Sequence, residues 1–202
     1  MDCVFVDVDT QVDFLDPAGS LYVPGSQEIL PNIRRLLEWA TRQQITTVSP
    51  VDAHVVDDVE FRQYGRHCVD GSPGQQRYFA ALPTLPRHVW EPAAELNDAE
   101  LRLLPGQHYV AKKRTFPMFS NAGLARLRDR GVFRGLRCVV FGVATDVCVR
   151  ADALDLCSAG ASVHVVRDAI AGLTPDGTER ALADMRAAGV AFTTTDAILT
   201  GP

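Results

Sequence analysis

Residues 138–157, CVVFGVATDVCVRADALDLC, decide the fold class. The apolar, β-branched and aromatic run over 139–141 predicts a strand buried on both faces. Small residues over 142–145 predict a tight turn, and a helix is expected to follow with Cys148 in its first turn. The N–H groups of a first helical turn are unpaired and carry partial positive charge, which favours a thiolate. Cys148 is therefore a candidate nucleophile, although a buried cysteine that packs as a small hydrophobe fits this stretch equally well.

The composition narrows the class of protein. The chain has 202 residues and a net charge of −5, and its length fits one domain, predicted to span residues 1–202. It contains no run of Lys and Arg, which argues against a nucleic-acid partner, and no apolar run as long as a membrane span. The start of the chain, MDCVFVDVD, lacks the basic segment of a signal peptide. Five scattered cysteines are typical of a reducing compartment, so a cytoplasmic location is expected.

Strand and helix patterns alternate along the chain. This alternation predicts an α/β fold, a doubly wound parallel sheet with helices on both faces. Besides the strand within 138–157, the expected strands are 3–9, 45–50, 88–90, 108–112, 162–168 and 190–195; the expected helices are 26–43, 93–102, a helix capped by Ser120 and running to Arg130, and 175–188.

Four separate segments deliver reactive side chains to strand ends. Asp9 follows the first strand, Asp52 and His54 follow the second, Lys113 follows the strand at 108–112, and Cys148 follows the strand within 138–157. The ligand crevice of a doubly wound sheet lies at the carboxyl ends of its strands. We therefore expect these residues to meet in one site.

The residue types at that edge suit acyl transfer. A cysteine nucleophile needs a base and donors for the oxyanion. Asp9 would take the thiol proton if a dry pocket raised its pKa, and Lys113 would hold the negative charge. The N–H groups of Cys148 and Ala144 would form the oxyanion hole.

A second set of residues suits a divalent metal. Asp52 and His54 lie close in the sequence to His67, and Glu60 is a tentative fourth ligand. The alternative is that these histidines are solvated residues of a long loop.

Several motifs together carry a family resemblance. They are D-x-Q-x-D-F at 9–14, D-x-H at 52–54, H-C-V-x-G-S-P-G at 67–74, K-R-T-F-P-M-F-S-N at 113–121 and G-V-A-T-D-V-C-V-R at 142–150. In this order they resemble the nicotinamidase branch of the isochorismatase-like cysteine hydrolases over nearly the whole chain. The resemblance implies a six-stranded parallel sheet, homo-oligomeric assembly, and a catalytic triad of Asp9, Lys113 and Cys148.

The resemblance also implies the details of the site. A cis peptide between Val143 and Ala144 would turn the Ala144 N–H into the oxyanion hole. Asp52, His54 and His67 would bind Zn²⁺ or a similar ion that receives the ring nitrogen of the substrate. Phe14 and Tyr64 would sandwich the ring.

The chain departs from the family pattern at the metal segment. Some members carry a third histidine where this chain has residues 55–60, so Glu60 is the substitute ligand. Gly65 and Arg66 replace two prolines, and Arg66 would either repel the cation or face solvent. Lys112 and Lys113 point opposite ways on a strand, and the family spacing favours Lys113.

Nicotinamide hydrolysis is the first functional hypothesis. The alternatives are another small-amide or carbamoyl hydrolase of the maleamate or biuret type, and a non-catalytic binding domain of the same fold. Isochorismate hydrolysis fits less well, because that vinyl-ether cleavage does not use a thiol.

Overall fold

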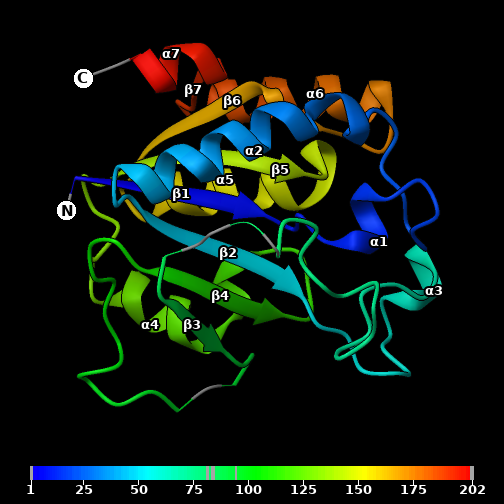
Figure 1. Ribbon diagram of the computed structural model, residues 1–202, viewed down its shortest axis with the longest axis horizontal. Helices are drawn as coiled ribbons and strands as arrows, with labels where there is room; N and C mark the ends of the chain where they lie inside the picture. The colour runs from blue at the N-terminus through cyan, green and yellow to red at the C-terminus, as the bar shows by residue number, and fades with distance from the viewer. Residues whose placement is uncertain (1, 81, 83–84, 94, 201–202) are drawn as a thin grey trace.

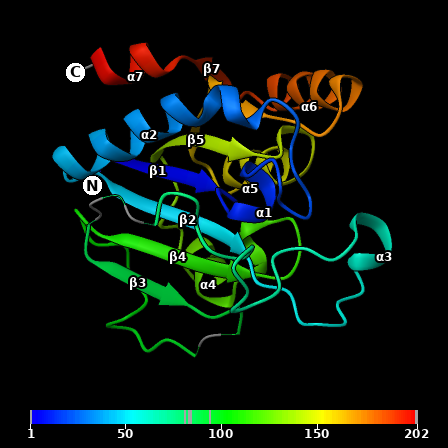
Figure 2. The ribbon, with the colours of Figure 1, turned by 45° about the vertical axis from the view of Figure 1, so that its right-hand side comes forward.

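The computed structural model describes residues 2–80, 82, 85–93 and 95–200. Its strands form one parallel sheet in the order β3-β4-β2-β1-β5-β6-β7, with helices on both faces (Figures 1 and 2). The strands are β1 (Cys3–Val8), β2 (Thr46–Asp52), β3 (Arg87–Trp90), β4 (His108–Lys113), β5 (Arg137–Val143), β6 (Ser162–Ala171) and β7 (Ala191–Thr193). The helices are α1 (Val12–Leu15), α2 (Ser26–Arg42), α3 (Phe61–Tyr64), α4 (Ala122–Asp129), α5 (Arg150–Ser158), α6 (Pro175–Ala187) and α7 (Thr195–Thr200), with a 3₁₀ turn η1 (Met118–Ser120) and a π-helical turn η2 (Thr145–Val149).

The predicted α/β class and parallel sheet are confirmed, but the six strands implied by the family resemblance are one fewer than the seven that the strand patterns of the sequence predict. The described residues form a seven-stranded sheet. Its edge strands β3 and β7 contain only 4 and 3 residues and pair on one side. Both edge strands lie where the sequence patterns predict strands, at 88–90 and within 190–195.

Three local predictions were wrong. Residues 93–102 form turns and bends instead of a helix, as far as they are described, since residue 94 lies outside the described part. The helix α4 is capped by Asn121, not Ser120, because the Asn121 side chain accepts the Leu124 N–H at 3.2 Å. The last predicted strand ends at Thr193, and the chain continues into α7.

Alternating side chains of the central strands enter two cores. In β1, Val4, Val6 and Val8 pack into the core beneath α4, α5 and α6, while Phe5 packs into the core beneath α2 and α7. All four are at most 1% exposed. This burial on both faces explains why the strands read as continuous apolar runs.

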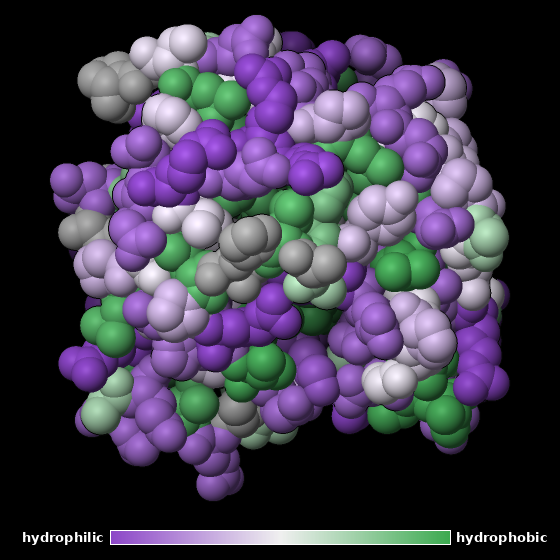
Figure 3. All heavy atoms as spheres, in the orientation of Figure 1, coloured by the Kyte–Doolittle hydropathy of each residue, from purple (hydrophilic) through white to green (hydrophobic). Residues whose placement is uncertain are grey.

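The strands all point toward the side of the molecule that carries α1 and α3 (Figure 1). The chain order changes direction beside β1, which pairs with β2 on one side and with β5 on the other. Ligands of doubly wound sheets bind at such a switch point. The face drawn in Figure 3 is mostly hydrophilic, with hydrophobic residues in separate groups. No helix among the described residues has the length and apolar character needed to span a membrane.

Candidate active site

Lys113 lies at the centre of a buried charged cluster. Its Nζ is 2.9 Å from Asp9 Oδ2, 2.5 Å from Asp52 Oδ1 and 3.7 Å from Cys148 Sγ. None of the four side chains belongs to a residue more than 5% exposed. The structure thus brings the three residues of the predicted triad together, and it adds Asp52, which the sequence had not linked to Lys113.

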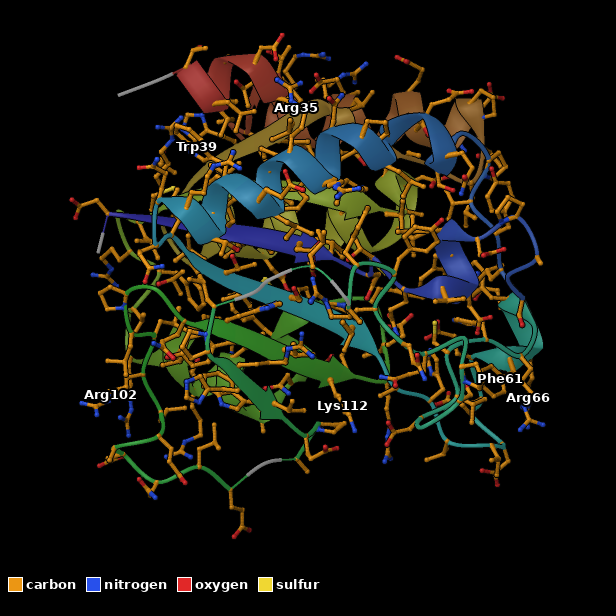
Figure 4. The ribbon with its side chains drawn as sticks, in the orientation of Figure 1. Arg35, Trp39, Phe61, Arg66, Arg102 and Lys112 are labelled. Atoms are coloured by element: carbon orange, nitrogen blue, oxygen red, sulfur yellow. The ribbon has the colours of Figure 1, made fainter. Side chains whose placement is uncertain are left out.

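The strand register explains this cluster. Asp52 and Lys113 are paired positions on the neighbouring parallel strands β2 and β4. Lys112, one position earlier, points to the other face and pairs with Asp70 at 3.0 Å and Glu91 at 2.9 Å. Figure 4 shows the Lys112 side chain near the carboxyl end of β4. The choice of Lys113 over Lys112 for the cluster therefore agrees with the geometry.

Asp9 is placed to exchange a proton near neutral pH. Burial, and next the charge of Asp52, raise the pKa of Asp9 to about 7 against the opposing effect of Lys113. Its Oδ2 accepts from Lys113, while Oδ1 is buried and has no hydrogen-bond partner in the described part of the chain. A free carboxylate oxygen with a pKa near 7 suits a general base.

Cys148 differs from the sequence expectation of a favoured thiolate. Burial raises the pKa of its thiol well above the usual range, and the carboxylates of Asp9 and Asp52 oppose the stabilising charge of Lys113. Lys113 stays protonated, because Asp52 and Asp9 outweigh the burial that would lower its pKa. The resting nucleophile is therefore a thiol, and forming the thiolate requires a base.

The turn that carries Cys148 is tightly built. The predicted cis peptide joins Val143 and Ala144. The N–H groups of Val147 and Val149 both donate to the Ala144 carbonyl, each at 3.1 Å. Cys148 lies in this π-helical turn, just before α5.

Four side chains at the end of β2 and in the following loop form a group that we call the metal group: Asp52, His54, Glu60 and His67. The Nε2 atoms of His54 and His67 lie 3.6 and 3.7 Å from Asp52 Oδ2, and each lies 3.8 Å from Glu60 Oε1. A tetrahedral zinc ion with bonds of about 2.1 Å holds its ligands roughly 3.4 Å apart. The spacing therefore fits a zinc-sized ion.

The hydrogen bonds around the metal group leave the correct atoms free. His54 Nδ1 lies 3.1 Å from Asp58 Oδ2, and His67 Nδ1 lies 2.8 Å from the Gly65 carbonyl. When Nδ1 donates, Nε2 presents its lone pair, as in metal-binding histidines. His54 Nε2 is buried without a hydrogen-bond partner in the described residues. The donor set thus fits a divalent cation.

Two residues of this loop, Asp58 and Arg66, go beyond what the sequence predicted. Asp58 was missed, because its role depends on the position of His54 and not on a motif. Arg66 is exposed and points away from the sheet beside α3, so it faces solvent (Figure 4).

A cavity joins Cys148 to Asp52, Glu60 and His67 of the metal group. Its lining includes the predicted ring contacts Phe14 and Tyr64 as well as Asp9 and Ala144. The cavity also has apolar lining residues that were not predicted from the sequence, which are Leu21, Val23, Phe116, Val147 and Leu173. Phe116 contacts Tyr64 edge-to-face, with ring centroids 5.7 Å apart. Its position three residues after Lys113 was the sequence feature that could have predicted a place in the site.

Comparisons with known proteins agree with this geometry. Residues 3–197 match the isochorismatase domain family. The chain is 30% identical to the nicotinamidase/pyrazinamidase of Mycobacterium tuberculosis over 193 residues, which cover 91% of this chain and 94% of that protein. It is 27% identical to the nicotinamidase of Escherichia coli over 208 residues, with 93% and 92% covered.

A solved structure extends the comparison to the fold. The pyrazinamidase of Pyrococcus horikoshii in complex with zinc is 28% identical, has a TM-score of 0.73, and is matched over 96% of this chain and 99% of that one. The family match and these relatives cover nearly the whole chain. The chain belongs to the isochorismatase family, in its nicotinamidase branch.

Proposed function

We propose that this protein is a metal-containing cysteine amidohydrolase that hydrolyses nicotinamide to nicotinate and ammonia. The observation that carries the proposal is the position of Asp52. One of its oxygens accepts from Lys113 beside Cys148, and the other faces the two histidines of the metal group. A nucleophile and a metal group thus share one small cavity with aromatic walls, which suits a flat ring that carries an amide.

The first half of the reaction acylates Cys148. Asp9 Oδ1 takes the thiol proton, and Lys113 holds the thiolate. The sulfur attacks the amide carbonyl, and the N–H groups of Ala144 and Cys148 hold the oxyanion. Asp9 then gives its proton to the leaving nitrogen, the C–N bond breaks, and ammonia departs from the thioester.

The second half releases the acid. Asp9, again ionised, removes a proton from water, and the resulting hydroxide attacks the thioester carbonyl. The C–S bond breaks, and the proton on Asp9 returns to the Cys148 sulfur. Each turnover consumes one water and restores the thiol.

The metal group would hold a divalent ion, and we propose Zn²⁺. An ion held by Asp52, His54, Glu60 and His67 would supply Lewis acidity for the ring nitrogen of the substrate. Phe14 and Tyr64 would flank the ring and orient its amide toward Cys148. Homo-oligomeric assembly and a cytoplasmic location stay predictions from the sequence.

The alternative substrates are maleamate-, biuret- or carbamoyl-type amides, which have no ring nitrogen. The metal group favours nicotinamide over them, because His54 Nε2 is buried without a partner among the described residues and such an atom is costly unless it binds something. A non-catalytic role is disfavoured, since Asp9, Lys113 and Cys148 are all present.

Ammonia release tests the proposal. The purified protein is assayed with nicotinamide, pyrazinamide, maleamate and biuret, and its metal content is measured on the same sample. We expect the highest kcat/KM for nicotinamide, with near-stoichiometric metal. Cys148→Ala should abolish turnover, whereas Cys157→Ala, a half-buried cysteine outside the cavity, should retain it. A protein without metal that prefers maleamate would contradict the proposal.

A further inference from the structure

Asp13 is a buried carboxylate that has no role in the proposed reaction or in the metal group. It is 8% exposed and lies in α1, next to Phe14 of the cavity wall. Its Oδ2 accepts the backbone N–H of Cys68 at 2.7 Å, and its Oδ1 accepts the backbone N–H of Ser20 at 3.1 Å. One carboxylate thus joins two loops that are far apart in the sequence.

The backbone around Asp13 is shaped for these contacts. Its N–H donates to the Gly74 carbonyl at 2.9 Å, and its carbonyl accepts the Leu21 N–H at 3.1 Å. A Cβ at Gly74 would lie 2.1 Å from Asp13 Oδ2, and a Cβ at Gly19 would lie 2.4 Å from the Asp13 carbonyl oxygen. Both positions therefore need glycine so that the loops can approach.

One arm of this contact leads to the metal group. Cys68 directly follows His67 and adopts a left-handed φ of 42°, which is uncommon for a residue other than glycine. Its carbonyl accepts the His54 N–H at 3.0 Å, and the Asp70 N–H donates to the His54 carbonyl at 2.9 Å. The segment after His67 is thus held by Asp13 on its N–H side and by the His54 backbone on the other.

The second arm leads to the substrate cavity. Ser20 precedes Leu21, which lines the cavity and whose own N–H is bound by Asp13. We propose that Asp13 is a positioning residue whose carboxylate sets His67 in the metal group and Leu21 in the cavity wall. This inference rests on the proposed function, because it requires a metal ion to bind there.

The substitution Asp13→Asn distinguishes a positioning role of the carboxylate from a role in packing alone. Asp13→Asn keeps the shape of the side chain but has one acceptor oxygen in place of two. Its amide NH₂ would face a backbone N–H, so either Cys68 or Ser20 would lose its partner. Residues that orient metal ligands typically contribute about 10–100-fold in metal affinity.

The test measures zinc affinity in metal-stripped protein by calorimetric titration with Zn²⁺. We expect 10–100-fold weaker binding for Asp13→Asn. Asp16→Asn is the matched control, since within the described part of the chain its half-exposed carboxylate accepts only the local Ala18 N–H. This variant should bind zinc within about twofold of the wild type. The alkylation rate of Cys148 in the same metal-free samples should stay within about twofold for both variants.

Gly74→Ala provides a second variant if Asp13→Asn fails to fold. It keeps the carboxylate but displaces it, so it should weaken zinc binding in the same direction. Wild-type zinc affinity in Asp13→Asn would overturn the inference, and so would an equal change in Cys148 alkylation, which would indicate a general structural role. A wild-type protein that binds no zinc would instead overturn the proposed function.

Discussion

Asp9 and Lys113 stand directly at strand ends and Cys148 stands in the turn η2 just after β5, whereas three of the four residues of the metal group stand on the loop after β2. Strand ends are held by the ladder of backbone hydrogen bonds across the sheet. The loop contains only the four-residue helix α3 as regular structure among its described residues. Each of the two histidines is therefore oriented by a single hydrogen bond, which His54 Nδ1 donates to Asp58 Oδ2 and His67 Nδ1 donates to the Gly65 carbonyl.

We call Asp9, Lys113 and Cys148 the strand half of the site and the metal group its loop half. Because the two halves are held in place differently, we expect substitutions in them to have separate effects. Substitutions in the strand half should abolish turnover without abolishing metal binding. Changes to one hydrogen bond in the loop should weaken metal binding and leave the reactivity of Cys148 intact.

The largest expected effect comes from Lys113→Met. Methionine keeps the volume but removes the charge, so Asp9 and Asp52 lose the cation between them and the thiolate loses its partner. We expect kcat to fall about 10²–10³-fold, in the range for loss of one preorganised electrostatic contact. Steady-state ammonia release measures it, with circular dichroism to verify folding.

Lys112→Met is the matched control for this change. Lys112 pairs with Asp70 and Glu91, which are largely solvent-exposed, and such pairs contribute little. Its kcat should stay within about twofold of the wild type. An equal decrease of kcat in the two variants would show that the buried charge of Lys113 has no specific role in turnover.

The same division explains what the sequence could predict. Asp9 and Lys113 stand at the ends of apolar runs, and Cys148 follows its run after one short turn, so the topology of a parallel sheet was enough to bring them to one edge. The contact of Lys113 with Asp52 was not predictable, because it depends on β2 and β4 being neighbours in register. Strand order is a long-range property that local periodicity does not contain.

The loop half was harder for the same reason. His54, His67 and Glu60 were identified from residue type and resemblance. Asp58 carries no chemical signature that separates it from other acids, and Asp13 stands in the D-x-Q-x-D-F motif without a role that the motif assigns to it. Their roles follow from where their carboxylates lie after folding. The cysteine pKa was mispredicted because the helix terminus was weighed without the burial and the two carboxylates beside it.

The pH dependence of Cys148 reactivity probes the strand half alone. Burial raises the pKa of Asp9 to about 7, so Asp9 is ionised and able to accept the thiol proton only above that pH. The rate of Cys148 alkylation by iodoacetamide in metal-free protein should therefore fall about tenfold per pH unit below 7 and level off above it. Peptide mass spectrometry gives the rate at this cysteine.

Asp9→Asn supplies the control for the pH profile. With no base of pKa near 7, this variant should lose the step near neutrality and react slowly at every pH up to 9. A wild-type profile that rises only above pH 9 would mean that the thiol titrates without help from Asp9.

The smallest expected effect comes from Asp58→Asn in the loop half. Asp58 Oδ1 accepts the Glu60 N–H at 3.0 Å, and its Oδ2 lies 3.1 Å from His54 Nδ1. If the asparagine oxygen keeps Glu60, the amide NH₂ donates to His54 Nδ1, which moves the imidazole proton to Nε2 and closes that atom to the metal. We expect roughly tenfold weaker zinc binding by calorimetry, at the low end of such effects.

Asp57→Asn is the natural comparison for this variant, because it makes the same change at an exposed neighbouring position. It should bind zinc as the wild type does. At saturating zinc, Asp58→Asn should recover most of its activity, and its Cys148 alkylation should match the wild type throughout. Loss of alkylation in Asp58→Asn would mean that the loop and the strand ends are coupled, since a defect confined to His54 has no route to the thiol when the ion is absent.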